Sequence, residues 1–436
     1  MTLNSLSALA CCVLIAQGCA SETRLPCAFV LSGPLANQDG AAWRGAQLAG
    51  EMPKPDWVGQ RKFDWSSSRT FARFDDASWP KEAKDQTRRW NELRLASVAL
   101  PDTAKAVERT MAFERELGAP LAVGFAANDH ALEGARAFCG FGVGGSAPML
   151  VVGVTDPAFP ADAGEGAYLV AISDDTQAVA AAEFIHDHLG GTCLAVVDST
   201  DGRMRQMVRD LTGALGGMGG AVAHVVDLRA SDLELALREA MKDHPSARSI
   251  YAAIGTKELA AVLPGMARCC GGLPIIGPDS FDHPELDRVE GLGATEIIYS
   301  AQAWFGDDAC IEATRFASYY RLTYGEEPTA AAALAFDAAR IAQFALVKAV
   351  RAEPGAAPRG EALAHEIDAL LAFPGATGRL SYRDGPVPVK DVWMVRLKAG
   401  KRELAASSMV DRRKADPRAG SAVPAGTSRP AAGAAR

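Results

Sequence analysis

The chain has 436 residues, of which 48% are hydrophobic and 22% are charged. This composition excludes a disordered or fibrous protein, and the length predicts two or three globular domains. The 45 basic and 53 acidic side chains give a net charge of −8, and no dense basic stripe interleaved with aromatic residues occurs, so a nucleic-acid partner is excluded.

The only long apolar run lies at the start of the chain, from Ser5 to Gly18. It is too short to cross a bilayer as a helix, but it suits the apolar core of a signal peptide. The run ends in AQGC, which resembles a bacterial lipobox, so residues 1–19 predict export and a lipid anchor on Cys19 as the only membrane contact. No Lys or Arg precedes the run and Ala16 replaces the usual Leu, so export without a lipid and a cytoplasmic protein with an apolar N-terminus stay open.

Export would permit disulfides, and six cysteines remain after the leader, which allow 15 pairings. They are Cys27, Cys139, Cys193, Cys269, Cys270 and Cys310. No C-x-x-C pair occurs and the seven histidines are scattered, so the sequence predicts neither a metal site nor a cofactor.

Short apolar segments that read as strands alternate with longer segments of helical period, a pattern typical of α/β folds. In the first part, strands are predicted in 27–35, 70–76, 119–128 and 147–156, with helices near 40–51 and from Pro80 to Leu95. The stretch 174–280 repeats strand and helix four times, with strands in 193–200, 221–228, 249–255 and 273–280. The sequence therefore predicts two doubly wound, Rossmann-like lobes, about 25–170 and 171–295, which would enclose a small molecule between the carboxyl ends of their strands.

Five segments in the right order resemble the leucine/isoleucine/valine-type periplasmic binding proteins. They are LSGPLANQDGAAWRGAQLAGE (31–51), FDDASWPKEAKDQTRRW (74–90), AVGFAANDHALEGA (122–135), YRLTYGEEPTAAAALAFDAARIAQFAL (320–346) and FPGATGRLSYRDG (373–385). The resemblance implies the type I fold, whose two lobes are joined by a three-segment hinge. Residues of about 296–375 would return to lobe I, and about 376–404 would add to lobe II.

The last segment, 405–436, is rich in Ala, Pro, Gly and Ser and carries six basic residues against two acidic ones. It is predicted to be a disordered basic tail.

The resemblance also suggests binding residues in lobe I. The turn after the third strand, which holds an amino acid's α-carboxylate in the family, falls on Ala127 and Asn128, so the usual Ser is replaced. The next strand end supplies Gly153, Val154 and Thr155.

In lobe II the aromatic residue that covers the ligand in the family is replaced near Asp201. Tyr251, or alternatively 254–256, lies at the next strand end. Asp279 stands where the family binds the ligand's ammonium group, although a helix cap or turn would explain this Asp equally well. These departures favour a basic amino acid, an amide or a polyol.

The resemblance implies an extracytoplasmic solute-binding protein of an ABC importer, which captures an amino acid or a similar small polar ligand for a permease with a separate ATPase. The sequence contains no G-x-S-x-G, H-E-x-x-H or phosphate-loop motif, so no enzyme is predicted. Two alternatives stay open: a ligand sensor of the same fold, and an envelope scaffold that has lost ligand binding.

Overall fold

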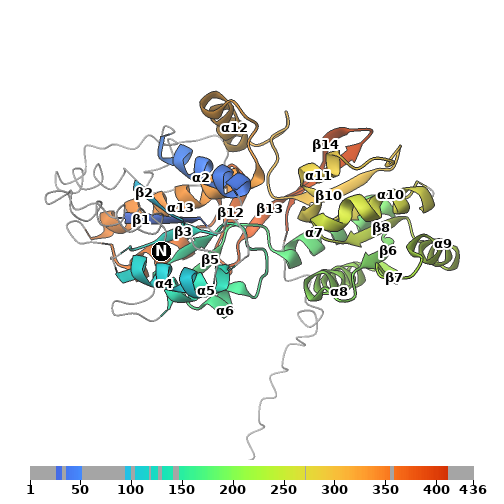
Figure 1. Cartoon of the computed structure of the whole chain (residues 1–436), viewed down its shortest axis with the longest axis horizontal. Coiled ribbons are helices and arrows are strands. Elements are labelled where there is room, and N and C mark those ends of the chain that lie inside the picture. The colour runs from blue at the N-terminus through green and yellow to red at the C-terminus, as the bar shows by residue number, and fades with distance from the viewer. Residues whose placement is uncertain are drawn as a thin grey trace, which may run out of the picture.

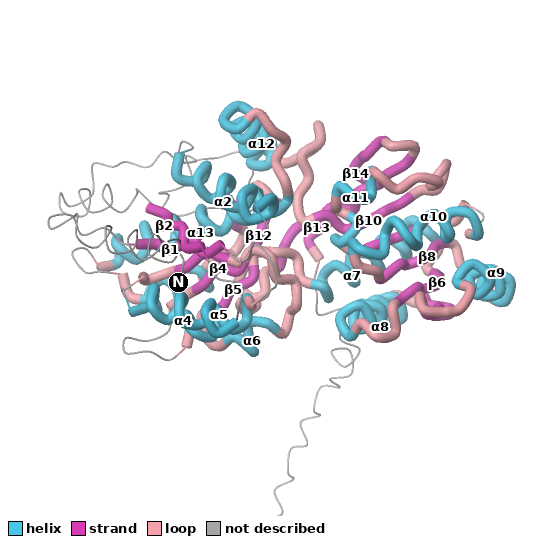
Figure 2. The backbone as a smooth tube through the Cα atoms, viewed as in Figure 1, coloured by secondary structure: helices cyan, strands magenta, loops and turns pink. Residues whose placement is uncertain are grey.

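Two α/β lobes joined by a narrow middle make up the computed structural model (Figure 1). The structure describes residues 26–31, 36–51, 94–99, 104–116, 119–125, 130–140, 147–270, 272–353 and 358–410. In each lobe the strands form a central layer with helices on both sides (Figure 2). The predicted fold class, α/β with two doubly wound lobes, is confirmed.

Lobe I is built on a parallel sheet in the order β2-β1-β3-β4-β5. Its strands are β1 (Pro26–Leu31), β2 (Arg94–Ala99), β3 (Ala122–Gly124), β4 (Met149–Val151) and β5 (Ala167–Leu169). One face is covered by α4 (Ala104–Glu116), α5 (Ala131–Cys139) and α6 (Phe159–Ala163), and the other by α2 (Ala36–Glu51) and α13 (Ala330–Ala352). Alternation along the strands explains this division, because Ala122 and Met149 pack towards α5, whereas Val123 and Leu150 pack towards α13.

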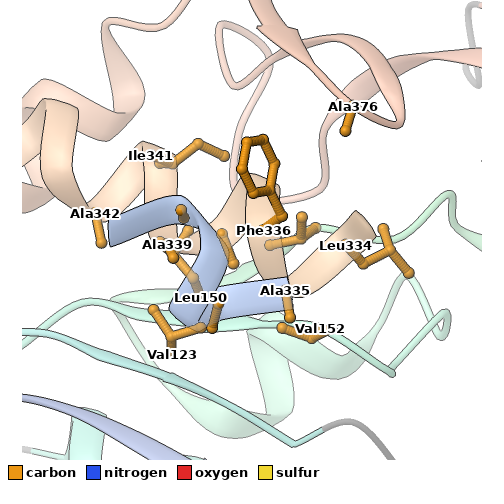
Figure 3. Packing of buried hydrophobic residues seen from close by; sticks show 14 of the residues in the cluster. Val123, Leu150, Val152, Leu334, Ala335, Phe336, Ala339, Ile341, Ala342 and Ala376 are labelled. Carbon is orange, nitrogen blue, oxygen red and sulfur yellow. The ribbon is translucent and has the colours of Figure 1, made fainter. Parts of the chain in front are cut away.

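Helix α13 is the centre of the lobe I core. Ala339 packs near Leu150 and Val123 of the sheet, and Ala335 packs near Val152 (Figure 3). Two further helices, α12 (Ile311–Tyr324) and α14 (Gly360–Asp368), join the same cluster. In the described part of the chain, α13 is also the one helix long and apolar enough to span a membrane, and 83% of that stretch is buried in the lobe. The expectation that the leader is the only long apolar run is therefore wrong.

Lobe II is built on a mixed sheet in the order β11-β12-β13-β10-β9-β8-β6-β7, with β14 paired to β13. Its strands are β6 (Thr192–Val197), β7 (Ala221–Asp227), β8 (Ser249–Ala253), β9 (Ile275–Gly277), β10 (Ile297–Ala301), β13 (Val389–Lys398) and β14 (Lys401–Met409). The strands β11 (Phe373–Gly375) and β12 (Gly378–Ser381) continue this sheet on the lobe I side, where Phe373 and Leu380 pack in the lobe I core. On one face lie α7 (Asp174–Leu189) and α8 (Gly202–Gly217), and on the other α9 (Leu233–Asp243), α10 (Leu259–Cys269) and α11 (Pro284–Asp287).

Three chain segments cross between the lobes and are bonded to one another. The backbone N–H of Ile172 in the first crossing donates to Oε1 of Gln302 in the second, at 2.7 Å. Lys390 in the third crossing is fully buried, and its Nζ donates to the Val170 carbonyl at 2.8 Å. The hinge is thus a bonded bundle of three segments.

Both return crossings lie later than predicted. Strand β10 pairs with β9 and β13, so lobe II continues to Ala301 and the crossing near 296 is wrong. Tyr382 still packs in the lobe I core, which places the third crossing near Lys390 and not near 376. A strand's partners are distant in sequence, so local apolar pattern could not reveal these positions.

Other local predictions also need correction. The structure has a strand from Arg94, where a helix was predicted to run to Leu95, and β14 extends to Met409, inside the predicted disordered tail. The predicted strand 70–76, the leader and residues 411–436 lie outside the described part. Cys193, Cys269, Cys270 and Cys310 carry free thiols.

Candidate functional site

Thr155 comes from the loop after β4 in lobe I and reaches the lobe interface. Its residue is 7% exposed, and its carbonyl accepts a hydrogen bond from the backbone N–H of Asp174 at 2.8 Å. Gly153 is bonded through its N–H to the Phe125 carbonyl, and the side chain of Val154 packs into the lobe I core. Among these three predicted residues, only Thr155 presents a polar side chain to the other lobe.

Arg203, in the first turn of α8, joins the two lobes. Its Nε and Nη2 donate to the two carboxylate oxygens of Asp174 at 2.6 and 2.7 Å, and Nη2 also donates to Oγ1 of Thr155 at 2.7 Å. The Arg203 side chain is 39% exposed, and among the described residues Nη1 has no hydrogen-bond partner. Asp174 therefore fixes a guanidinium group that still has an open donor edge.

Asp279 follows β9 and lies on the same interface. Its Oδ1 is 3.9 Å from Nη2 of Arg203, and its Oδ2 accepts a hydrogen bond from Nε2 of Gln302 at 2.8 Å. The backbone N–H of Asp279 donates to Oε1 of Gln177, which also accepts from the Ser300 hydroxyl. Two buried amide side chains therefore hold Asp279 against the hinge.

Burial and charge act in opposite directions in this cluster. Burial raises the pKa of Asp279, and the Arg203 guanidinium partly offsets this. Burial alone would lower the pKa of Arg203, but its hydrogen bonds and attraction to Asp174 raise it instead. The cluster therefore keeps a permanent positive charge between Asp174 and Asp279.

Tyr251 lies beneath the charged groups. It is 1% exposed, and its hydroxyl is buried with no hydrogen-bond partner in the described structure. Burial raises its pKa, with further effects from Asp174 and Asp279. The predicted residue is thus placed in the floor of the site.

Asp201 has a structural role at the start of α8, and its predicted contact with the ligand stays a prediction. It is the N-cap of α8, and its Oδ1 accepts hydrogen bonds from the backbone N–H groups of Arg203 and Met204. An N-cap carboxylate satisfies amides that have no partner within the helix. Ala127, Asn128 and Cys19 lie outside the described residues.

Four residues of this cluster were not predicted from the sequence: Arg203, Asp174, Gln177 and Gln302. The sequence does indicate Arg203, because a cation in the first turn of a predicted helix opposes the helix dipole and therefore suggests a specific anionic partner. The sequence also indicates Gln302, because this residue lies within the apolar stretch 297–305 and a buried amide needs hydrogen-bond partners.

The arrangement can bind but shows no nucleophile–base pair. Arg203 offers donors for a carboxylate or another acceptor, and Asp279 offers an acceptor for an amine or hydroxyl. No group of three potential metal ligands occurs in the described residues.

A family model described as "Periplasmic binding protein" matches residues 28–402. The chain belongs to this family. Membership implies an extracytoplasmic location. A search of curated proteins found no match to this periplasmic binding protein.

Solved structures show the same fold at low identity. A leucine-binding protein LivK from Thermotoga maritima is 20% identical, with a TM-score of 0.62 over 88% of this chain and 98% of the other. LivJ from Streptococcus pneumoniae in complex with isoleucine is 17% identical, with a TM-score of 0.59 over 89% and 99% of the two chains. A solute-binding protein from R. palustris in complex with benzoate is 16% identical, with a TM-score of 0.59 over 89% and 97%.

Proposed function

We propose that this chain is the solute-binding protein of an ABC importer. It encloses an amino acid or a similar small polar ligand between its lobes and presents it to a membrane permease that is driven by a separate ATPase. A lipid on Cys19 anchors it to the membrane, and no covalent chemistry takes place on the ligand.

The interlobe contact of Arg203 supports this proposal most directly. A guanidinium from lobe II bonds to Thr155 of lobe I and lies 3.9 Å from Asp279. Polar groups of both lobes therefore meet where a hinged protein closes on its ligand.

Arg203 and Asp279 indicate the chemistry of the ligand's head group. Nη1 of Arg203 is placed to donate to a carboxylate, and Asp279 is placed to accept from an amine, both as charge-assisted hydrogen bonds. The LivJ relative binds isoleucine and the R. palustris relative binds benzoate, two ligands that share a carboxylate. A carboxylate is thus the feature that we assign to the ligand first.

A scaffold without a ligand is the second candidate, and one observation favours it. Arg203 already bonds to Thr155 and pairs with Asp174, so a side chain of the protein itself bridges the lobes.

A thermal-shift screen of the protein from residue 20 onwards tests both candidates. The compounds are amino acids, amides, polyamines, sugars and carboxylates that include benzoate. At a hundredfold excess over its dissociation constant, a ligand stabilises by about 2.7 kcal/mol, which shifts the melting temperature by several degrees. A shift that Asp279→Asn or Arg203→Ala reduces supports solute binding, whereas no shift with any compound favours the scaffold.

Transport and sensing are separated by reconstitution. The ligand-loaded protein should stimulate ATP hydrolysis by its permease complex in liposomes. A ligand-loaded protein that leaves this rate unchanged contradicts the importer.

A further inference from the structure

A second pocket lies between the lobes, beside the second crossing. It has a volume of about 400 Å³ and is lined from lobe I by the loop Glu327–Ala330 and from lobe II by Asp282, Tyr299 and Arg402. Trp304 and Phe305 of the crossing complete its wall. We call this the hinge pocket; its lining includes Arg321 of α12, Pro284 of α11 and Arg402 of β14, three elements labelled in Figure 1.

The hinge pocket is separate from the Arg203 cluster because the two lie on opposite faces of the lobe II sheet. Successive side chains of a strand point to opposite faces. In β10, Ser300 bonds to Gln177 on the α7 face, whereas Tyr299 and Ala301 line the hinge pocket. Gln302 lies on the same side as Ser300 in this alternation, and its Nε2 donates to Asp279.

Aromatic side chains form a fixed wall of the hinge pocket. Nε1 of Trp304 donates to Oδ1 of Asp308 at 2.6 Å, which fixes the indole. The Phe305 ring lies 5.9 Å from the Phe316 ring, centroid to centroid, and Tyr299 is only 1% exposed. Such ring faces attract organic cations as well as apolar groups.

Three of the charged groups around the hinge pocket already have ion partners. Nε of Arg321 donates to both carboxylate oxygens of Glu327 at 2.9 Å. Nη2 of Arg402 lies 2.9 Å from Oδ1 of Asp287.

Asp282 is the exception. In the described structure its carboxylate has neither an ion pair nor a hydrogen bond, and burial raises its pKa to about 7, with Arg402 opposing this effect. Nε of Arg402 is also buried without a hydrogen-bond partner. The described lining of the pocket therefore holds a carboxylate without a partner, at a half-buried residue, and a buried donor without a partner, next to aromatic rings. A buried donor of this kind is costly unless something binds it.

We propose that the hinge pocket is a second ligand site, which takes a small organic amine. Its ammonium group pairs with Asp282, and its apolar body rests against Trp304 and Phe305. An amine that also carries an acceptor can take a hydrogen bond from Nε–H of Arg402. Because both lobes line the pocket, its occupant also resists their separation.

Calorimetric titration of the full chain with benzylamine tests the proposal, with benzyl alcohol as the neutral probe of similar shape. Benzylamine should bind at least tenfold more tightly than benzyl alcohol. Asp282→Asn, which keeps the side-chain shape, should weaken benzylamine binding at least tenfold, and Phe305→Leu should weaken it about fivefold through loss of the ring. The matched control Asp243→Asn, an exposed carboxylate at the end of α9, should have no effect.

Equal affinities for the two probes would overturn the proposal, as would unchanged binding to Asp282→Asn. Phe305→Leu decides the outcome if the Asp282 variant does not fold. Arg203→Ala should leave benzylamine binding intact; its loss would place the amine in the Arg203 cluster and overturn the second site. A failure of the hinge pocket is thereby distinguished from a failure of the proposed solute site, which requires Arg203.

Discussion

Arg203 shows how one side chain can be stable in an unfavourable position. A cation in the first turn of a helix opposes the helix dipole, at a cost of about 0.3–1 kcal/mol. The two hydrogen bonds to buried Asp174 offset this cost, since hydrogen bonds to charged groups contribute about 1.5–3 kcal/mol each.

Arg203→Ala should therefore lower the free energy of unfolding by about 2 kcal/mol, because Asp174 is left buried without its partner. It should also weaken binding of a carboxylate ligand at least tenfold. Urea unfolding and titration of the screening hit measure the two effects. Arg205→Ala, two residues further along α8 on its exposed side, is the control and should change stability by less than about 0.5 kcal/mol. Equal behaviour of the two variants would contradict the role of Arg203.

The N-cap role of Asp201 gives a separate prediction. Asp201→Ala should cost about 1 kcal/mol of stability and leave ligand affinity unchanged. Asp232, which caps α9 by accepting from the backbone N–H of Leu235, is a matched cap far from the Arg203 cluster, and Asp232→Ala should cost a similar amount. A loss of affinity in the Asp201 variant alone would restore the ligand-binding role that the sequence suggested.

The pKa of Asp282 makes stability depend on pH. The folded protein holds this proton up to about pH 7, whereas the unfolded chain releases it near pH 4, so the contribution of Asp282 to stability is lost as pH rises between these values. Arg402 opposes the pKa shift, and Asp279 and Asp287 reinforce it. Asp282→Asn should therefore melt about 2–4 °C above the wild type at pH 8, with the difference vanishing near pH 4. A difference that is constant across this range would contradict the raised pKa.

Among the elements, α2 and α13 pack most closely. A Cβ atom on Gly45 of α2 would lie 1.9 Å from the carbonyl oxygen of Ala332 in α13, so the two helices meet nearly backbone to backbone. The alanines along α13 make this approach possible because they add little side-chain volume.

Gly45→Ala should force these helices apart and cost about 3 kcal/mol. Gly40→Ala in the same helix is the control, because nothing lies within 4 Å of its added Cβ, and it should stabilise the protein by about 0.5–1 kcal/mol. Urea unfolding compares the two variants, and a small effect at both positions would show that α2 can move away from α13.

Elements with strong local patterns were predictable and those defined by distant partners were not. The strand–helix repeats of 174–280 show clear hydrophobic periods, N-cap residues and glycines at helix ends. Gly190, which has a positive φ, ends α7 in this way. β2 was missed, and the crossing after β10 was misplaced, because their pairing partners lie far away in sequence. In the site, strand ends suggested Thr155 and Asp279, but the bond between the lobes is made by Arg203, which donates to Thr155 from 48 residues further along the chain.

At the scale of the whole molecule, Lys390 ties the crossings together. Its Nζ is buried at the hinge and bonds to the Val170 carbonyl, and burial lowers its pKa to about 8, with Asp337 opposing the shift. Lys390→Met should cost about 2 kcal/mol or more, because the Val170 carbonyl and buried Asp337 both lose a compensating group. Lys401→Met, at an exposed position in β14, serves as the control in urea unfolding. An unchanged free energy of unfolding in Lys390→Met would mean that the other hydrogen bonds of the hinge hold the three crossings together without Lys390.

The contact between α2 and α13 also dictates an order of events during synthesis. Nε2 of Gln343 donates to the carbonyl of Ala49, a partner 294 positions earlier. A chain that emerges from its N-terminus therefore exposes the apolar face of α2 until residues beyond Ala330 have appeared. Lobe II waits even longer, because β13 and β14, residues 389–409, must add to β10 to complete its sheet. Neither lobe is complete until most of the chain has been made, so the new chain exposes apolar surface to aggregation for most of its elongation.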